Sequence, residues 1–306
     1  MRAAAIPPWG LPALGAALIA LAAIGDTRLA LILAVWFGAW ALNAVLANRG
    51  GASGGLRLMV PLIFGVTLLT LWELSVRLYG ISFVILPAPS AIWARMLTST
   101  TILWADFQQT ILKGALAGYV MGCGAAFLAA LAVDRSGFLQ RGLLPVGNFI
   151  AALPIVGTAP IFVMWFGFGW QSKSAVVVAM VFFPMLVNCV QGLKASDAMQ
   201  RDLMRTYAAS YWQTLAKLRL PTAMPFIFNG LKICTTLALI GAIVAEFFGS
   251  PTVGMGFRIK IEMGRLAMDM VWAEIAVAAL AGSGFYGLVA LVERRLTFWH
   301  PSQRRG

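Results

Sequence analysis

The sequence predicts an all-α integral membrane protein. Its 306 residues are 60% hydrophobic and 11% charged, whereas soluble domains carry about 25% charged residues. The mean hydropathy is +0.85. A helix of about 20 apolar residues is long enough to cross a bilayer. Eight apolar segments approach that length, at 10–25, 29–47, 58–79, 110–133, 143–168, 174–193, 224–248 and 272–292.

The first two apolar segments are separated only by Asp26, Thr27 and Arg28. The first is short, and its Ala-rich end is also compatible with the apolar part of a signal peptide. Because a second apolar segment follows at once, a tight transmembrane hairpin is the favoured interpretation. A Gly-rich linker at 48–57 follows, so residues 1–57 are predicted to form an N-terminal two-span extension.

The net charge of +12 indicates membrane topology rather than a nucleic-acid ligand. Lys and Arg gather near one set of span ends, which includes both termini and the polar interval 194–223. The positive-inside rule places this set in the cytoplasm. We therefore expect both termini, including the tail 301–306, to be cytoplasmic, and we expect the bilayer but no nucleic acid as a partner.

The longest polar interval runs from Asp197 to Pro221, and its apolar residues have helical spacing. They recur every three or four positions, which predicts one stripe on a helix made of Met199, Leu203, Tyr207, Tyr211, Leu215 and Leu218. Arg201, Arg205, Gln213 and Lys217 fall outside this stripe. Such an amphipathic helix either rests on lipid or docks on a partner.

Two carboxylates lie near the expected external ends of apolar spans, Glu73 in 58–79 and Glu246 in 224–248. Charged residues inside spans are costly and often functional. They either line a gate or form structural ion pairs, for which Arg77 and Lys232 are candidate partners. The sequence leaves both readings open.

Three further segments carry predictions about helix packing, an interfacial helix and an external loop. Gly114, Gly118 and Gly122 are spaced to allow close helix packing, which we favour over a substrate lining. Ser90 is predicted to be the N-cap of an interfacial helix at 90–98, after two helix-breaking prolines. Residues 249–271 are predicted to form a Gly-rich external loop.

Enzyme chemistry has little support in this sequence. It contains no G-x-S-x-G, H-E-x-x-H or P-loop motif. Cys123, Cys189 and Cys234 stand in separate spans without disulfide or metal spacing. The single histidine, His300, stands beside Trp299 and suits an interfacial anchor. We expect no metal and no cofactor on this chain, so any ATP must be hydrolysed by another subunit.

The polar interval resembles the EAA loop of ABC-importer permeases. The family pattern is E-A-A, three residues, Gly, nine residues and then I-x-L-P. Its Glu, Gly, Ile, Leu and Pro positions hold Asp202, Ala208, Leu218, Leu220 and Pro221 in this chain. Two departures from the pattern are Leu203 and Met204, which replace the paired alanines.

Further segments resemble the permease subfamily that imports nitrate, sulfonates, taurine and vitamin precursors. They occur in that subfamily's order: L-P-A-P-S-A-I-W at 86–93, W-F-G-F-G-W-Q-S-K at 165–173, A-E-F-F-G-S-P-T-V-G-M-G at 245–256 and E-R-R-L-T-F-W at 293–299. One departure is Trp170, which stands where an acidic residue is common.

The resemblance implies the six-helix core of a type I ABC importer over residues 58–300, preceded by two added spans, in the bacterial inner membrane. It implies a second copy of the chain, two cytoplasmic ATPase subunits that bind ATP and Mg²⁺, and an external substrate-binding protein.

The loop 194–223 would couple the permease to the ATPase. Its apolar contacts would be Met199, Leu203, Met204 and Tyr207. Asp202 and Arg205 would fix the orientation, and Ala208 would permit a bend between two short helices. Leu220 and Pro221, with Leu218 before them, would return the chain to the bilayer, and Pro221 would end the second helix.

The substrate and its path are less defined. Candidates for the translocation path or gate are Glu73, Glu246, Gly254 and Met255. A small anion such as a sulfonate, taurine or nitrate would suit the external residues Arg258, Lys260 and Arg265, whereas Glu262 and Asp269 weaken that signal. A thiamine or riboflavin precursor is the alternative substrate.

Two other functional classes predict features that the sequence lacks. A secondary transporter or channel predicts charges at mid-depth and inverted repeats. A polytopic membrane enzyme predicts clustered His, Asp or Glu at one membrane face.

Overall fold

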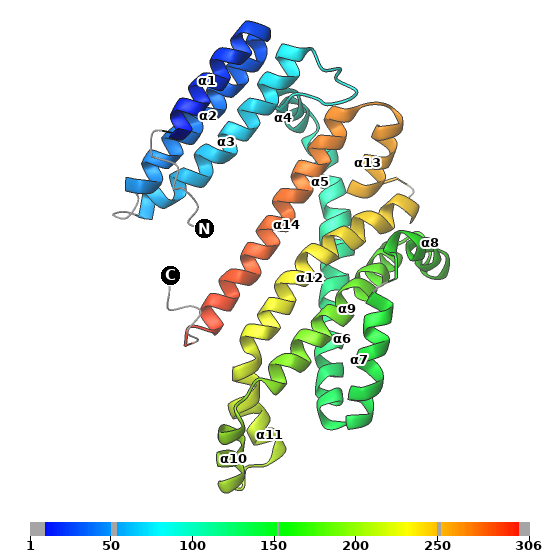
Figure 1. The fold of residues 1–306 in the computed structure, drawn as a ribbon. Helices are drawn as coiled ribbons and strands as arrows, with labels where there is room; N and C mark the ends of the chain where they lie inside the picture. Colours follow the sequence, from blue (N-terminus) through cyan, green and yellow to red (C-terminus); the bar gives the residue numbers. More distant parts are fainter. Residues whose placement is uncertain (1–9, 50–53, 152, 250–251, 300–306) are drawn as a thin grey trace. The chain divides into compact units, whose positions relative to one another are not determined.

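The computed structural model describes residues 10–49, 54–151, 153–249 and 252–299, and every regular element in those ranges is a helix (Figure 1). This confirms the all-α prediction. Six helical segments of the described chain are long and apolar enough to cross a membrane: Thr27–Ala47, Met59–Tyr79, Thr100–Arg135, Trp170–Lys194, Tyr211–Gly249 and Met268–Leu296.

The chain divides into two compact units, Met1–Thr98 with Leu266–Ala273, and Ser99–Arg265 with Glu274–Gly306. The first unit begins with a helical hairpin of α1 (Gly10–Gly25) and α2 (Thr27–Arg49). Asp26 forms the turn, where its Oδ1 accepts a hydrogen bond from the Arg28 amide at 2.9 Å. The first two apolar segments therefore form two helices in contact, and their crossing of the membrane stays a prediction.

The helix α3 (Gly54–Tyr79) follows. The next helix, α4 (Pro89–Thr98), includes the predicted helix 90–98, and its place at the membrane interface stays a prediction. Ser90 is not its N-cap, which corrects the prediction. The carbonyl of Ala88 accepts the amides of Ala91 and Ile92, at 2.9 and 3.1 Å. Pro89 thus takes the first helical position, where its fixed φ is suitable and no amide is needed.

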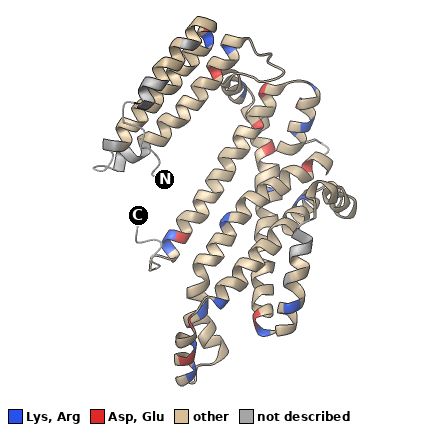
Figure 2. Ribbon diagram, viewed as in Figure 1, with Lys and Arg blue, Asp and Glu red and all other residues tan. Residues whose placement is uncertain are grey.

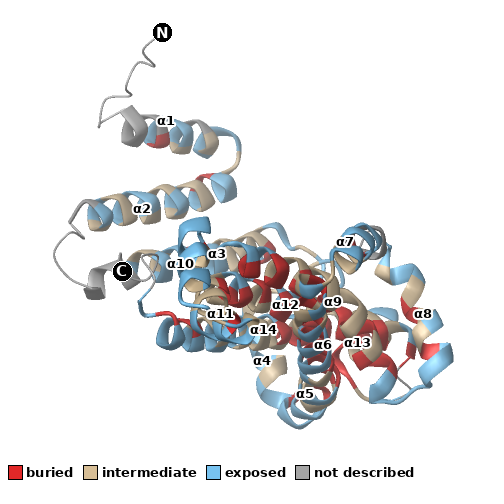
Figure 3. Cartoon of the chain, turned by 90° about the horizontal axis from the view of Figure 1, so that it is seen from below, coloured by how far each residue is buried: buried red, intermediate tan, exposed pale blue. Residues whose placement is uncertain are grey.

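The second unit contains, in chain order, α5 (Thr100–Phe107), the π-helical η1 (Gln108–Ala115), α6 (Leu116–Arg135), α7 (Gly137–Ala151), α8 (Ile155–Phe166), α9 (Trp170–Lys194), α10 (Ala198–Thr206), α11 (Tyr211–Thr214), the π-helical η2 (Leu215–Arg219), α12 (Leu220–Gly249), α13 (Met255–Gly264) and most of α14 (Met268–Leu296). Helices α6, α9 and α12 pack side by side with α9 in contact with both others (Figure 1). The buried residues of the unit gather along these three helices (Figure 3).

Glycines set the spacing between α6 and α9. A Cβ atom at Gly118 would lie 2.5 Å from Val177 Cβ, and one at Gly122 would lie 2.4 Å from Val181 Cγ2. Both distances are far below van der Waals contact, so only glycine permits this approach. Gly114 is looser, at 3.5 Å from Lys173 Cβ. The predicted role in tight packing is therefore confirmed for Gly118 and Gly122.

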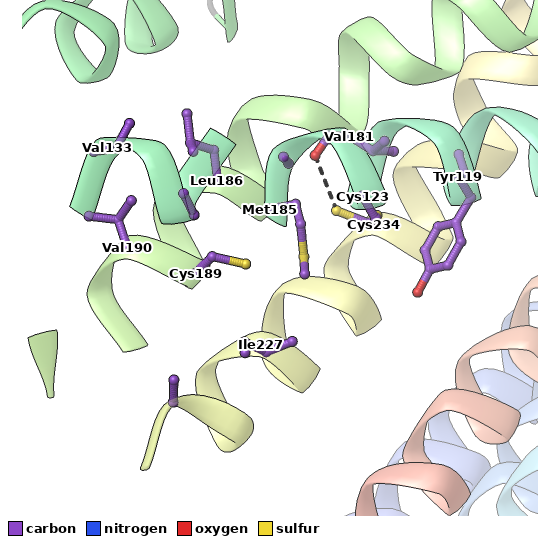
Figure 4. Packing of buried hydrophobic residues seen from close by; sticks show 14 of the residues in the cluster. Tyr119, Cys123, Val133, Val181, Met185, Leu186, Cys189, Val190, Ile227 and Cys234 are labelled. Atoms are coloured by element: carbon purple, nitrogen blue, oxygen red, sulfur yellow. Dashed lines mark hydrogen bonds between the residues drawn. The ribbon is translucent and has the colours of Figure 1, made fainter. Parts of the chain in front are cut away.

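The buried cluster between the three helices is apolar apart from a few sulfur and hydroxyl groups (Figure 4). All three cysteines are buried and free. The Cys234 thiol donates a hydrogen bond to the carbonyl of Val181 at 3.4 Å. The Tyr119 hydroxyl donates to the carbonyl of Leu231 at 3.1 Å. The thiol and the hydroxyl thus find acceptors on neighbouring helices, where an apolar surrounding offers none.

The structure corrects two predicted boundaries. The segment 143–168 is not one span, because α7 ends at Ala151 and α8 begins only after Pro154, which has extended backbone at φ −69° and ψ 112°. Proline lacks the amide that would continue the α7 ladder. Residues 249–271 are not only a loop, because they contain the ten-residue helix α13.

Charged side chains are sparse along the middle of the long helices and concentrate near helix ends (Figure 2). Lys232, within α12, is an exception, and it forms an ion pair of 2.8 Å with Glu293 of α14. Pairing reduces the cost of placing either charge inside an apolar helix bundle. Lys232 is therefore engaged by Glu293 and not by Glu246, its predicted candidate partner.

We predict that Gly118→Ala destabilises the fold by about 1–3 kcal/mol, because the added methyl group must displace α9. Gly124→Ala, on the same helix, is the matched control, because a Cβ atom there meets no atom within 4 Å. The measurement is the free energy of unfolding in detergent micelles. Equal values for the two variants would show that the α6–α9 spacing does not depend on glycine.

Candidate functional site

The polar loop 194–223 starts with a well-defined cap. The carboxylate of Asp197 accepts the amide of Met199 at 3.4 Å, which starts α10. The Arg201 guanidinium reaches back to the Ser196 carbonyl at 2.6 Å. Because Ser196 is buried, this bond holds the start of α10 against the end of α9.

The helix α10 exposes an apolar face. Its residues Met199, Leu203 and Tyr207 at the C-cap are 79%, 56% and 77% exposed, and no residue of α10 is buried (Figure 3). Three large apolar side chains at i, i+4 and i+8 lie on one side of a helix. An exposed patch of this kind indicates a surface for another molecule.

The other predicted coupling residues of α10 lie beside this face. The Arg205 guanidinium pairs with Asp202 at 3.1 Å, and both side chains are largely exposed. Exposed pairs at this spacing stabilise a helix by only about 0.3–0.5 kcal/mol. Met204 is half-buried. The pair therefore fixes local geometry and contributes little to the stability of the fold.

The loop bends sharply at Ala208, which has φ +50°. Its amide donates to the carbonyl of Arg205 at 2.8 Å, and the Ala209 amide donates to that of Met204 at 3.0 Å. A residue with a Cβ atom costs about 1–2 kcal/mol in this left-handed region, where glycine costs little. The glycine of the family pattern would therefore fit here with less strain.

The bend corrects the prediction of a single apolar stripe. After it, α11 begins with a capping box in which the Ser210 amide donates to Gln213 Oε1 at 2.8 Å. Leu215 is then buried, and Tyr211 is half-buried. The stripe thus splits into an exposed half on α10 and an inward half on α11 and η2.

Pro221 does not end a helix, which corrects another prediction. Helical structure continues from Tyr211 to Gly249, and the π-helical turn Leu215–Arg219 precedes the proline. Proline lacks an amide but is tolerated in the first turn of a helix. Leu218 and Leu220 are half-buried on this continuous path, so the loop runs into α12 without a break in helical structure.

A second cluster lies where η1, α12 and α13 meet, and we call it the α13 cluster. Glu246 is 1% exposed. Its oxygens accept the Thr110 hydroxyl at 2.9 and 2.8 Å and the Gly256 amide at 2.9 Å. The Thr110 oxygen also accepts the Met255 amide at 2.8 Å. The start of α13 is thus held by a buried carboxylate and a hydroxyl.

Gly254 is required by this geometry. Its φ is +133°, and a Cβ atom there would lie 2.5 Å from the Glu246 carboxyl carbon. Its amide donates to Asp106 Oδ1 at 2.6 Å. Met255 beside it is fully buried. Gly254, Met255 and Glu246 therefore meet in one closed cluster, and their predicted role in a translocation path stays a prediction.

Two cations and two further carboxyl groups complete the α13 cluster. Arg258 pairs with Asp106 at 2.8 Å. The buried Lys173 ammonium donates to the Phe168 carbonyl at 2.6 Å and to the Gly249 carbonyl at the end of α12. A cation at a helix C-terminus is favourable. Glu274 of α14 is fully buried and lies beside Asp106 and Arg258.

The basic residues predicted to suit an anion are each engaged within the chain. Arg258 binds Asp106, the Lys260 ammonium donates to the Phe247 carbonyl at 2.8 Å, and Arg265 pairs with Glu262 at 3.2 Å. They do not converge on a shared pocket among the described residues. The remaining acidic residue, Asp269, pairs with Arg95 at 3.5 Å.

Glu73 forms the predicted pair with Arg77, with Nε to Oε1 at 2.5 Å. The same carboxylate accepts the Ser90 amide at 2.9 Å and the Ser90 hydroxyl at 2.7 Å. Glu73 therefore joins α3 to the start of α4. This favours the structural reading, and a gate role for Glu73 stays a prediction.

Sequence reasoning missed Asp106, Thr110 and Lys173, which hold the α13 cluster together. One signal was available for two of them. Asp106 and Lys173 stand at the ends of apolar segments, and buried charges are almost always paired. Gly254, the partner of Asp106, and Gly249, one of the two partners of Lys173, lie more than 70 residues away, so spacing along the chain could not identify them.

The chain is similar to known membrane transport proteins. Residues 118–298 match the family model described as binding-protein-dependent transport system inner membrane component. The chain is 30% identical over 243 residues to the formylaminopyrimidine transport permease protein ThiX of Halalkalibacterium halodurans, covering 79% of this chain and 96% of that protein.

Two further relatives have similar coverage. The riboflavin transport system permease protein RibX of Chloroflexus aurantiacus is 31% identical over 237 residues, covering 77% of this chain and 88% of the relative. The taurine transport system permease protein TauC of Escherichia coli is 30% identical over 277 residues, covering 84% and 98%.

We predict that Thr110→Val destabilises the protein by about 1–3 kcal/mol, because the Met255 amide and the Glu246 carboxylate lose a shared buried partner. Thr101→Val is the matched control, since Thr101 is exposed on α5. Thermal unfolding in detergent measures both variants. If Thr110→Val unfolds together with wild type, the hydroxyl is not needed to hold α13.

Proposed function

The chain belongs to the family of binding-protein-dependent transport system inner membrane components, and we propose that it is the membrane-spanning permease subunit of an ATP-driven ABC importer. Two copies would form the translocation path, and a substrate-binding protein would deliver solute to their external face. Two separate ATPase subunits would bind ATP and Mg²⁺ and dock on the loop 194–223, which would then be cytoplasmic together with both termini.

The exposed apolar face of α10 is the observation that carries this proposal. Protein interfaces draw most of their binding free energy from a few large side chains that become fully buried. Met199, Leu203 and Tyr207 provide such side chains, and they are more than half exposed in the isolated chain. A groove on the ATPase would cover them, while Asp202 and Arg205 would orient the helix.

A lipid surface is the other occupant to consider, and the charge pattern of α10 argues against it. A helix that lies on lipid carries free Lys and Arg on its polar face. The polar face of α10 carries only two basic residues, Arg201 and Arg205, and Asp202 pairs with the second of them. The helix also projects beyond the ends of α9 and α12 (Figure 1). These features favour a protein partner.

The proposed substrate is a small organic or inorganic anion such as a sulfonate, taurine or nitrate. The named transport of taurine by one relative supports this class. Relatives named for formylaminopyrimidine and riboflavin support the alternative, a vitamin or vitamin precursor. Arg258, Lys260 and Arg265 are engaged within the chain, so we assign substrate selection to the external binding protein rather than to these residues.

We predict that Leu203→Asp abolishes stable binding of the ATPase. A charge would replace a side chain buried at the interface, and the loss of such a contact costs about 2 kcal/mol or more, or about 30-fold in Kd. The measurement is the amount of ATPase that copurifies with the tagged permease from detergent-solubilised membranes.

Ala198→Asp provides the matched control for this experiment. Ala198 is exposed in the first turn of the same helix, away from the apolar face, and an acidic residue there is favourable for the helix. It should copurify with as much ATPase as wild type. Normal ATPase recovery with Leu203→Asp would contradict the docking proposal.

A further inference from the structure

A partly buried ion pair joins the inward half of the loop to the end of α6. The carboxylate of Asp134 accepts two hydrogen bonds from the Arg219 guanidinium, at 2.8 and 2.5 Å. Their side chains are 8% and 15% exposed. The Tyr211 hydroxyl donates to the same carboxylate at 2.8 Å. Paired contacts of this kind fix the angle between the two groups as well as their distance.

Arg219 also extends the connection to α9. Its Nε and Nη2 atoms donate to the carbonyl of Leu193 at 3.1 and 3.0 Å. One guanidinium on η2 therefore holds the last turns of α6 and α9 together. Lysine could not form this arrangement, because it lacks the planar fork of donors.

A stacking contact reinforces the same junction. The Arg135 guanidinium lies over the rings of Tyr211 and Trp212, at 4.6 and 5.1 Å from their centroids. Such cation–π contacts are favourable. We call Asp134, Arg135, Tyr211 and Arg219 the clamp. Its residues come from α6, α11 and η2, and Arg219 contacts the last turn of α9.

The helix α10 lacks any comparable attachment. It contains no buried residue, and in the described chain it packs extensively on no other helix. Because α10 packs so little on other helices, a movement of α10 is passed to the bundle through the residues that connect it to α9, at Ser196, and to α11, at the Ala208 bend. The second connection enters α11 directly at the clamp.

We propose that the clamp is the rigid joint that transmits movement of α10 to α6, with Asp134 and Arg219 as positioning residues. This inference rests on the proposed function, in which the ATPase moves α10. With the clamp intact, α11, η2 and the adjacent ends of α6 and α9 move as one body. Without it, α11 pivots at η2 and α10 moves without carrying α6.

The single substitutions Asp134→Asn and Arg219→Met each leave a buried partner unmatched, which destabilises the fold whatever the role of the pair. The double variant Asp134→Asn/Arg219→Met removes both charges, so it leaves none unpaired. It is therefore the decisive variant, because normal expression and normal ATPase copurification show that it folds and docks, so that loss of the nucleotide response alone points to the joint. Lys217→Met is the matched control, because Lys217 is exposed on η2, two residues from Arg219.

The reporter is a cysteine at position 164, Met164→Cys, at the opposite end of the second unit. Met164 is 83% exposed on α8 in the isolated chain, whereas the three native cysteines are at most 5% exposed, so labelling is assigned to position 164 rather than to a native cysteine. The complex of permease and ATPase is reconstituted in nanodiscs. The rate of labelling by a membrane-impermeant maleimide is measured without nucleotide and after trapping with ATP and vanadate.

We expect the wild type and Lys217→Met to show a nucleotide-dependent change in labelling rate. The double variant should copurify with normal amounts of ATPase but lose this change, because α10 then moves without α6. Allosteric coupling typically changes an equilibrium constant by about 5- to 150-fold, which sets the size of the change that should disappear. A double variant that responds to nucleotide as wild type does would overturn the clamp while leaving ATPase docking intact. Failure of wild-type copurification would overturn the proposed function and the clamp together.

Discussion

The close packing of α6 against α9, and of α9 against α12, is the constraint on which the rest of the second unit depends. Gly118 and Gly122 bring α6 close to α9, and Gly230 and Gly241 bring α12 close to α9. In an apolar solvent, helices associate through such close contact rather than through the hydrophobic effect. The register that these glycines impose brings Thr110 to Glu246 at one end and Asp134 to Arg219 at the other.

The two ends of this bundle use the same chemistry for different purposes. At the α13 cluster, buried carboxylates take up the amides of Gly254 and Gly256, so the end is closed by internal hydrogen bonds. At the loop end, the polar network stops at α11, and α10 beyond it presents apolar side chains with no cover. We therefore assign the exposed apolar face of α10, at the polar loop end of the bundle, to a protein partner.

Much of this arrangement could be predicted from the sequence, and the failures have physical causes. Hydropathy found most of the spans, and helical spacing found the amphipathic residues of the loop 194–223. Hydropathy missed the break at Pro154, because apolar residues continue on both sides of it. Periodicity predicted one stripe through Tyr207 and Tyr211, because an alanine at φ +50° carries no signal of a bend. Gly254 and Arg219, which bind Asp106 and Asp134, and Gly249, which binds Lys173, come from distant segments that only the helix register brings together.

The central claim is that the apolar face of α10 binds an ATPase. A photoactivatable phenylalanine analogue at position 203, introduced in the full-length chain in its native membrane, tests this most directly. Irradiation followed by mass spectrometry should identify a cross-link from residue 203 to an ABC ATPase subunit, and the same analogue at exposed position 138 on α7 should give no such product. Cross-linking of residue 203 to lipid alone would contradict the account.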